Sequence, residues 1–248
     1  MTPQQVTSPA LAGVAHGTSS PEGRDAVAAL MAAVADARPE LTTVLGFVDV
    51  QQPDTEETLD ALNDVTLVPL LLSAGYHVHV DLTAAVEARP RQAITLAAAL
   101  GPDPRLVALL LRRLQEAGLA PGDAVVLCAA GSSDARAVVD CRAVAAALAS
   151  TSGREVDIGF LSAAEPTLAE AVGQARMRHP DARVVVSSYL VAPGYFQGLA
   201  EGAGGDVTTE PLLSVTDSAP AELVELVLDR YDTCTACTTC GRLCQRQG

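Results

Sequence analysis

The stretch Leu11-Ala12-Gly13-Val14-Ala15-His16-Gly17-Thr18-Ser19-Ser20 decides the fold of this chain. A short apolar run ends in a histidine, a glycine and three hydroxyl residues follow, and Pro21 opens an Ala-rich helical pattern. This order predicts a buried strand, a tight loop and the start of a helix. Open α/β folds bind ligands at the carboxyl ends of their strands, where this loop places His16. Because a single histidine there is more often structural than catalytic, its role depends on partners elsewhere in the chain.

The composition favours a globular protein with an aliphatic core. Hydrophobic residues make up 49% of the 248 positions and aromatic residues only 3%, so Ala, Val and Leu must fill the core. The net charge of −14 argues against binding to nucleic acids or anionic membranes. No apolar run approaches the roughly 18 residues of a membrane-spanning helix, and the N-terminal residues lack the features of a signal peptide. We therefore expect a cytoplasmic protein, either a monomer or a homodimer.

Apolar runs alternate with amphipathic segments, and the alternation starts again after a linker around Pro121. Continuous apolar runs of this kind suit parallel strands that are buried on both faces. The expected strands are residues 10–15, 41–48, 65–72, 93–99, 124–130, 156–161, 183–190 and 207–213. The expected helices with two bounds are residues 22–37, 106–117 and 220–231. Further helices are expected in a short segment carrying Leu59 and Leu62 and in the segment after the turn at 73–82. Two more are expected, one ending at Leu148 and one starting at Pro166.

The two series also match in their residues. Residues 15–19 align with 129–133, residues 46–49 with 159–162, and residues 73–77 with 192–196. The period is about half of the chain, which indicates an internal duplication. The sequence therefore predicts an α/β fold of two tandem doubly wound parallel-sheet domains. Their expected bounds are 1–120 for the half with the active site and 121–232 for a degenerate half, followed by a Cys-rich tail at 233–248.

The comparison of the two halves singles out three residues. Each candidate ligand of the first half has an inert residue at its position in the second half: Ala130 for His16, Ser162 for Asp49 and Phe196 for His77. Packing alone gives no reason for all three to change together. Each of the three sits at the carboxyl end of a different expected strand, and such ends converge on one crevice. We therefore expect His16, Asp49 and His77 to form a site.

Two imidazoles and a carboxylate suit a divalent transition metal such as Fe, Co, Ni or Zn. Imidazoles also act as general bases near neutral pH. The residues alone are compatible with a metal hydrolase or with a protein that transfers metal ions.

Three motifs resemble the sirohydrochlorin chelatases, the ATP-independent class II chelatases of siroheme and cobalamin biosynthesis. They are Ala15-His16-Gly17-Thr18-Ser19, Phe47-Val48-Asp49 with Pro53, and Pro69-Leu70-Leu71-Leu72-Ser73-Ala74-Gly75-Tyr76-His77 with Asp81. The resemblance covers residues 10 to about 231 and is to the long form of the family, a fused tandem with its active site in one half.

The resemblance implies a lyase that inserts Fe²⁺ or Co²⁺ into sirohydrochlorin, as a ferrochelatase or cobaltochelatase. It implies that His16 and His77 bind the metal and take protons from the pyrrole nitrogens. The family usually has a glutamate where this chain has Asp49, so the third role is the least secure. No phosphate-binding Walker loop is present, and the chain has no lysine to complete one, which agrees with ATP independence.

Residues around these motifs are candidates for binding the carboxylates of the substrate. Hydroxyls and backbone N–H groups of Thr18, Ser19 and Ser20 lie at an expected helix start, where anions bind. Arg24 would offset the negative field of the protein, although a solvated helix face is an equal alternative. The third motif adds Ser73 and Gly75. Asp81 either orients His77 or caps a helix, and we expect His79 to point away from the site.

The tail contains four cysteines with the spacing x2, x2, x3: Cys234, Cys237, Cys240 and Cys244. This is the spacing of the bacterial ferredoxin run, except that Gln245 replaces the usual proline. An Fe–S cluster or zinc is favoured over transient metal capture or a redox-labile tail. A metallochaperone without catalytic activity, using the histidine pair and this tail, is the rival function.

Overall fold

The computed structural model describes residues 8–73, 75, 77–214 and 217–236, without the side chains of 77–79 and 236. Each half forms a four-stranded parallel sheet, as the sequence predicts. The first sheet has the order β2-β1-β3-β4 and consists of β1 (Ala10–Ala15), β2 (Thr43–Phe47), β3 (Asp64–Pro69) and β4 (Ala93–Leu96). The second has the order β6-β5-β7-β8 and consists of β5 (Ala124–Ala129), β6 (Val156–Phe160), β7 (Val184–Tyr189) and β8 (Val207–Thr208).

Both faces of each sheet are covered by helices. In β1, Leu11 and Ala15 face one hydrophobic cluster, and Ala12 and Val14 face another. The outer faces carry short helices: α2 (Thr55–Asp60), the π-helix η1 (His77–Leu82) and α3 (Thr83–Glu87) in the first half, and α6 (Leu168–Arg178) and α7 (Tyr195–Glu201) in the second. The inner faces carry the long helices α1 (Pro21–Ala37) and α5 (Ala135–Ser152). This arrangement confirms the doubly wound architecture.

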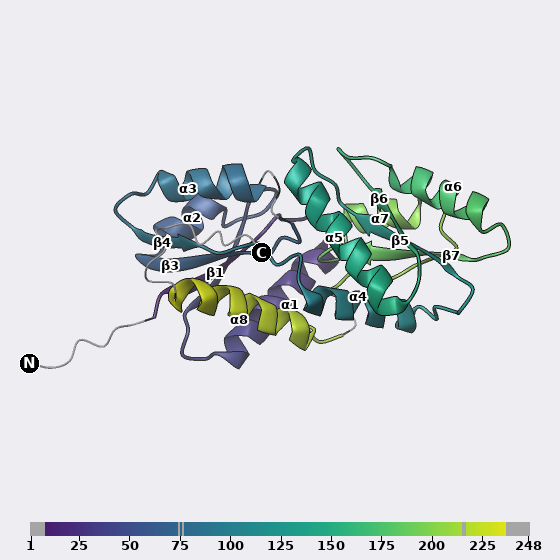
Figure 1. Ribbon diagram of the computed structural model, residues 1–248. Coiled ribbons are helices and arrows are strands. Elements are labelled where there is room, and N and C mark those ends of the chain that lie inside the picture. The colour runs from purple at the N-terminus through teal and green to yellow at the C-terminus, as the bar shows by residue number, and fades with distance from the viewer. Residues whose placement is uncertain (1–7, 74, 76, 215–216, 237–248) are drawn as a thin grey trace, which may run out of the picture.

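The last helix of each half packs on the other half. Helix α4 (Pro104–Glu116) follows the first sheet in the chain but contacts α5 and β7 of the second. Helix α8 (Ala221–Ala236) follows the second sheet but contacts α1, β3 and β4 of the first. Figure 1 shows α8, in yellow, lying beside α1 in the lobe of β1 and β3. We infer that 1–120 and 121–232 are sequence repeats rather than separately folding units.

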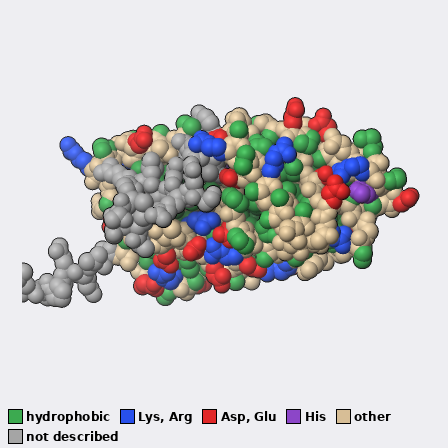
Figure 2. All heavy atoms as spheres, in the orientation of Figure 1, with side chains coloured by type: hydrophobic (Ala, Val, Ile, Leu, Met, Phe, Trp, Pro, Cys, Tyr) green, Lys and Arg blue, Asp and Glu red, His purple; other side chains and the backbone are tan. Residues whose placement is uncertain are grey.

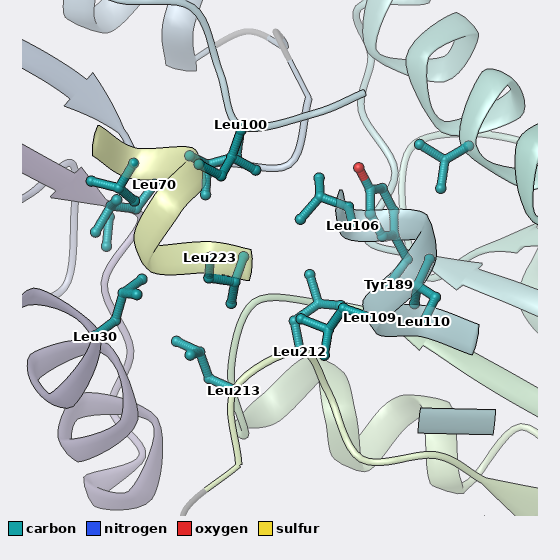
Figure 3. Packing of buried hydrophobic residues seen from close by; sticks show 14 of the residues in the cluster. Leu30, Leu70, Leu100, Leu106, Leu109, Leu110, Tyr189, Leu212, Leu213 and Leu223 are labelled. Atoms are coloured by element: carbon teal, nitrogen blue, oxygen red, sulfur yellow. The ribbon is translucent and has the colours of Figure 1, made fainter. Parts of the chain in front are cut away.

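One hydrophobic core joins the two halves. It includes Leu30 and Leu70 from the first half and Tyr189 and Leu212 from the second half. Leu109 of α4, the helix that packs on the second half, also belongs to it. In Figure 3, Leu100 and Leu223 lie between these two groups. The continuous core is a direct result of the exchanged helices, since α4 and α8 contact each other as well as the two sheets.

Two arginines hold the connections through which the chain crosses between the halves. Arg113 of α4 is 4% exposed and donates to the carbonyl oxygens of Pro211 (3.1 Å) and Leu212 (3.2 Å). It also pairs with Glu116 (2.7 Å) and Asp217 (3.1 Å). Burial opposes the charge of this guanidinium, but its carboxylate partners outweigh that effect and raise its pKa. The connection into α8 is therefore tied to α4.

Arg230 of α8 makes the reciprocal contacts on the connection into α4. Its guanidinium donates to the carbonyl oxygens of Ala99 and Leu100, each at 2.9 Å, and to Asp103 at 3.3 Å. The two helices align without gaps from Leu106 and Leu223 onward, and Arg113 then coincides with Arg230. Thus each exchanged helix carries an arginine at the same aligned position. That arginine binds the segment of chain that leads into the other helix.

Three elements differ from the sequence-based prediction. The expected strand 207–213 is only Val207–Thr208, because Pro211 lacks an N–H and its carbonyl oxygen binds Arg113. The helix expected to start at Pro166 starts at Leu168, because the Pro166 carbonyl oxygen accepts from Phe160 N (3.0 Å) and Thr167 is the N-cap. The segment at 195–201, which is not among the expected helices, is helix α7.

The surface of the face in Figure 2 carries mixed acidic and basic side chains along its lower edge, where Figure 1 places α1, α8 and α4. Ion pairs join these helices. Arg38–Asp232 (3.2 Å) connects the end of α1 to α8, and Arg112–Glu222 (2.7 Å) connects α4 to α8. In the part of the chain that is described, no helix is long and apolar enough to cross a membrane.

Candidate functional site

A cavity of about 650 Å³ lies between the two halves. In each sheet the strand order reverses at the first strand, so a crevice opens between the carboxyl ends of β1 and β3 and between those of β5 and β7. Loops from all four of these strands line the cavity, and its volume is in the range of roughly 300–1,000 Å³ typical of small-molecule sites. The crevices of the two halves therefore open into one cavity.

The predicted site residues of the first half line one wall of this cavity. His16 follows β1, has an exposed side chain and lines the cavity. Thr18 and Ser19 line it from the same loop, and Ser73 and Gly75 from the loop after β3. The structure thus brings five of the predicted site residues to one cavity.

The loop that carries His16 is held next to Asp49 by backbone contacts. Asp49 N donates to the His16 carbonyl oxygen at 2.9 Å. Gly17 has φ +99°, and a Cβ there would collide with the carbonyl oxygen of Asp49, so only glycine fits. The second half repeats this geometry with Ser162 N donating to Ala130 O at 3.0 Å. The scaffold of the loop is therefore the same in both halves, and only the side chains differ.

The carboxylate of Asp49 is not among the groups that line the cavity. Its Oδ1 accepts from Val50 N at 2.7 Å, in a turn where Val50 has φ +67°. Val50 and Gln51 line the cavity instead. The sequence places Asp49 at the end of a strand but cannot show that its side chain folds back on the next amide.

Internal hydrogen bonds already engage several amides at the start of α1. Thr18 N donates to Gln51 Oε1 at 2.8 Å, and Ser20 N donates to Thr18 Oγ1 at 3.1 Å. Ser20 is the N-cap of α1 and accepts from Gly23 N at 3.3 Å. Gln51 was not predicted as a site residue, because its contact with Thr18 spans two loops and has no sequence signal.

Arg24 supports this loop from outside the cavity. Its Nε donates to the Thr18 carbonyl oxygen at 3.1 Å and its Nη2 to the Ser19 carbonyl oxygen at 3.4 Å. Among the described residues that line the cavity there is no arginine, aspartate or glutamate. Arg24 therefore orders the loop and does not itself line the cavity.

The two halves touch each other reciprocally at the cavity. A Cβ on Gly23 of α1 would collide with the carbonyl oxygen of Pro193, in the loop after β7. In the opposite direction, Gly75, in the loop after β3, lies close to Ser132 and Ala137 at the start of α5. Gly23 is thus needed for close contact between the halves.

Cys141 and Tyr189 line the deeper part of the cavity. Burial raises the pKa of the Cys141 thiol to about 11, with the nearby Asp140 acting in the same direction and a hydrogen bond with Ser73 opposing it. Tyr189 Oη donates to the Leu72 carbonyl oxygen at 2.9 Å, across the two halves. A thiol with such a raised pKa stays protonated at neutral pH and is inert.

The side chains of His77 and His79 lie outside the described residues; the backbone of His77 starts the π-helix η1. Among the side chains that are described, no group of three or more His, Cys, Asp or Glu could hold a metal ion. The predicted triad of His16, Asp49 and His77 therefore stays a prediction.

The first cysteine of the tail motif is part of the core. Helix α8 continues past the predicted end at 231 to Ala236, and Cys234 in its last turn is 5% exposed. Its Sγ lies 4.0 Å from the carbonyl oxygen of Leu96 in β4. Cys237, Cys240 and Cys244 lie outside the described residues.

Two α/β halves with exchanged last helices surround a cavity with an imidazole on one wall, and this architecture is the chelatase-like fold. The sequence model of the CbiX family matches residues 10–117 and 124–198, and the chain belongs to this family. No curated protein matches the chain significantly.

Three solved structures share the fold. SirB from Bacillus subtilis, determined with Fe³⁺, has a TM-score of 0.77 and 20% identity, covering 93% of this chain and 96% of that chain. SirB from Bacillus subtilis subspecies spizizenii, in complex with cobalt, has a TM-score of 0.74 and 17% identity, covering 93% and 97%. A CbiX described as the terminal enzyme of siroheme biosynthesis in denitrifying bacteria has a TM-score of 0.60 and 19% identity, covering 89% and 98%.

Proposed function

We propose that this chain inserts a divalent metal ion into sirohydrochlorin without ATP, with Fe²⁺ as the favoured metal and Co²⁺ as the next. The observation that carries the proposal is the position of His16, on the wall of the cavity between the halves, in a chain of the CbiX family. The names of the similar structures, sirohydrochlorin chelatases with Fe³⁺ or cobalt, support the substrate and the metals.

The chemistry requires two changes at the reacting centre. The macrocycle loses two pyrrole N–H protons, and the metal ion exchanges its water or protein ligands for the pyrrole nitrogens. A neutral imidazole can coordinate the incoming ion through its lone pair and, once the ion is released, accept a proton with that same lone pair. We assign both roles to His16 and to His77, with one proton taken by each.

Asp49 takes a smaller part in this proposal. Its backbone N–H is bound to the His16 carbonyl oxygen, and its carboxylate caps the Val50 amide. In this geometry Asp49 fixes the loop that carries His16, and it becomes a metal ligand only if its side chain turns from Val50. The hydroxyls of Thr18, Ser19 and Ser73 provide hydrogen-bond donors for substrate carboxylates.

The direct test is an anaerobic assay with purified protein, metal-free sirohydrochlorin and Fe²⁺, Co²⁺ or Ni²⁺, followed by the absorbance of the macrocycle. We expect insertion without added ATP, fastest with Fe²⁺. Faster insertion of Co²⁺ would contradict the preference for Fe²⁺ and assign the protein to cobalamin synthesis rather than to siroheme synthesis. Metal binding without insertion into the macrocycle would contradict the proposal and favour the metallochaperone alternative.

We also propose that the cysteine tail binds an Fe–S cluster or zinc, on the basis of its x2, x2, x3 spacing. Cys234 can be a ligand only if its thiol leaves the core packing against β4. We expect metal analysis and visible absorbance of anaerobically purified protein to show the bound group, and Cys237→Ser and Cys240→Ser to remove it. Cys128→Ala, in the buried strand β5, is the control. Metal content unchanged in both tail variants would contradict this proposal.

A further inference from the structure

The second-half wall of the cavity differs in chemistry from the first-half wall. The first half contributes the imidazole of His16 and the polar side chains of Thr18, Ser19, Gln51 and Ser73. At the position of His16 the second half has Ala130, which also lines the cavity. The second-half wall keeps hydroxyls at Ser132 and Ser133, and the loop after β7 adds Val191, Ala192 and Pro193 together with the aromatic side chains of Tyr195 and Phe196.

Two aromatic residues are exposed on this second wall. Tyr195 is 76% exposed and Phe196 is 36% exposed, with ring centroids 5.9 Å apart and the planes tilted by 38°. The other aromatic side chains that the structure describes are at most 6% exposed: Phe47, Phe160, Tyr189 and Tyr231. Exposed apolar surface of this kind marks a binding surface when it gathers in one place. Here it gathers at the cavity.

Helix α7, which presents the two rings, is held firmly in place. Gln197, the next residue, is 8% exposed; its Oε1 accepts from Ser188 Oγ at 2.7 Å and its Nε2 donates to the Thr209 carbonyl oxygen at 3.1 Å. These bonds tie the first turn of α7 to β7 and to the segment after β8. The helical turn that carries the aromatic pair is therefore held in place before a ligand binds, which reduces the entropy lost on binding.

The alignment of the two halves places Phe196 at the position of His77 and Tyr195 at the position of Tyr76. The second half has thus replaced an imidazole by a larger apolar ring beside a retained tyrosine. If this half served only as a scaffold, a small residue would be sufficient, as Ala130 is at the position of His16. The presence of two rings on the surface of the cavity indicates that this wall binds a flat apolar group.

We propose that Tyr195 and Phe196 form a stacking platform for the conjugated plane of the tetrapyrrole, so that its central nitrogens are presented to His16. This inference rests on the proposed function, which supplies the flat macrocycle. Aromatic faces stack favourably on one another in offset or tilted arrangements. Tyr195 and Phe196 are positioning residues, because they hold the substrate while the first half performs the chemistry.

The test compares the double variant Tyr195→Ala/Phe196→Ala with the wild type in the insertion assay and in the binding of metal-free sirohydrochlorin, followed by absorbance. We expect the KM and Kd for the tetrapyrrole to rise about tenfold or more, with the KM for the metal ion unchanged. Tyr195→Phe/Phe196→Tyr keeps both rings and should restore wild-type values. Leu199→Ala is the matched control, since Leu199 is 38% exposed on the same helix but does not line the cavity.

Far-UV circular dichroism of the variants checks that α7 is still folded. Wild-type insertion together with an unchanged KM for the tetrapyrrole in the double variant would overturn the platform and leave the proposed function standing. An equal rise in Leu199→Ala, or no recovery in the ring-preserving variant, would also overturn it. A wild-type protein that neither binds nor metallates sirohydrochlorin would overturn the proposed function and the platform together.

Discussion

His16→Ala is expected to slow metal insertion into sirohydrochlorin by roughly 10²–10⁴-fold, the usual contribution of a positioned acid–base group. The side chain lines the cavity without being part of the core, because it is exposed at the end of β1. Its loss should therefore leave the stability and the binding of the metal-free macrocycle nearly unchanged. The initial rate with Fe²⁺, measured anaerobically at saturating tetrapyrrole, gives the effect directly.

Two further measurements make this result specific. His179→Ala removes an imidazole from the exposed end of α6, away from the cavity, and should insert metal at the wild-type rate. Imidazole added to the solution should partly restore His16→Ala, because a small base can enter the space left in the cavity. A wild-type rate in His16→Ala would contradict our assignment of the metal-binding and proton-accepting group.

Arg113→Met is expected to lower the free energy of unfolding by at least about 2 kcal/mol, because each of two buried carbonyl oxygens loses its donor at about 1–3 kcal/mol. The methionine keeps the apolar stem of the side chain. It leaves the carbonyl oxygens of Pro211 and Leu212 without their donor inside the protein. Urea unfolding followed by far-UV circular dichroism measures this loss, and the chain has no tryptophan for a fluorescence signal.

Arg112→Met is the matched control for this change. Arg112 is the preceding residue of α4, its side chain is 42% exposed, and it pairs with Glu222 at 2.7 Å. Exposed pairs contribute only about 0–1 kcal/mol, so the control should unfold close to the wild type. Similar midpoints for Arg113→Met and Arg112→Met would show that the buried arginine does not hold the crossing connection.

The sequence was sufficient to predict the order of the strands, the helices other than α7, and the tandem arrangement. The strands are rich in Val, Leu and Ala, and the loops after β1 and β5 have the same pattern of residues. The predicted position of His16 depends only on this local order, and the structure places it at the cavity. The same local reasoning fails where a segment's partner is distant, as with Pro211, whose carbonyl oxygen binds Arg113 and ends the expected strand early.

The parts that could not be predicted are contacts between distant segments and side-chain contacts set by local backbone geometry. The amphipathic pattern of α4 and α8 predicts that each helix buries one face, but it does not show against which sheet. The side chain of Asp49 turns to the Val50 amide, and Arg24 binds loop carbonyls, because of local backbone geometry that a sequence pattern does not contain. The role of Gln51 was missed because its contact with Thr18 joins two loops that are distant in the sequence.

The exchange of α4 and α8 also has an evolutionary consequence. A gene that encoded only one repeat would produce a sheet whose inner face lacks its second helix, while the chain's own last helix would extend away from it. Two molecules of such a protein could complete each other by trading these helices across a twofold axis. Fusion of the repeats places both partners in one gene, so that one copy is free to lose its imidazole while the other keeps it.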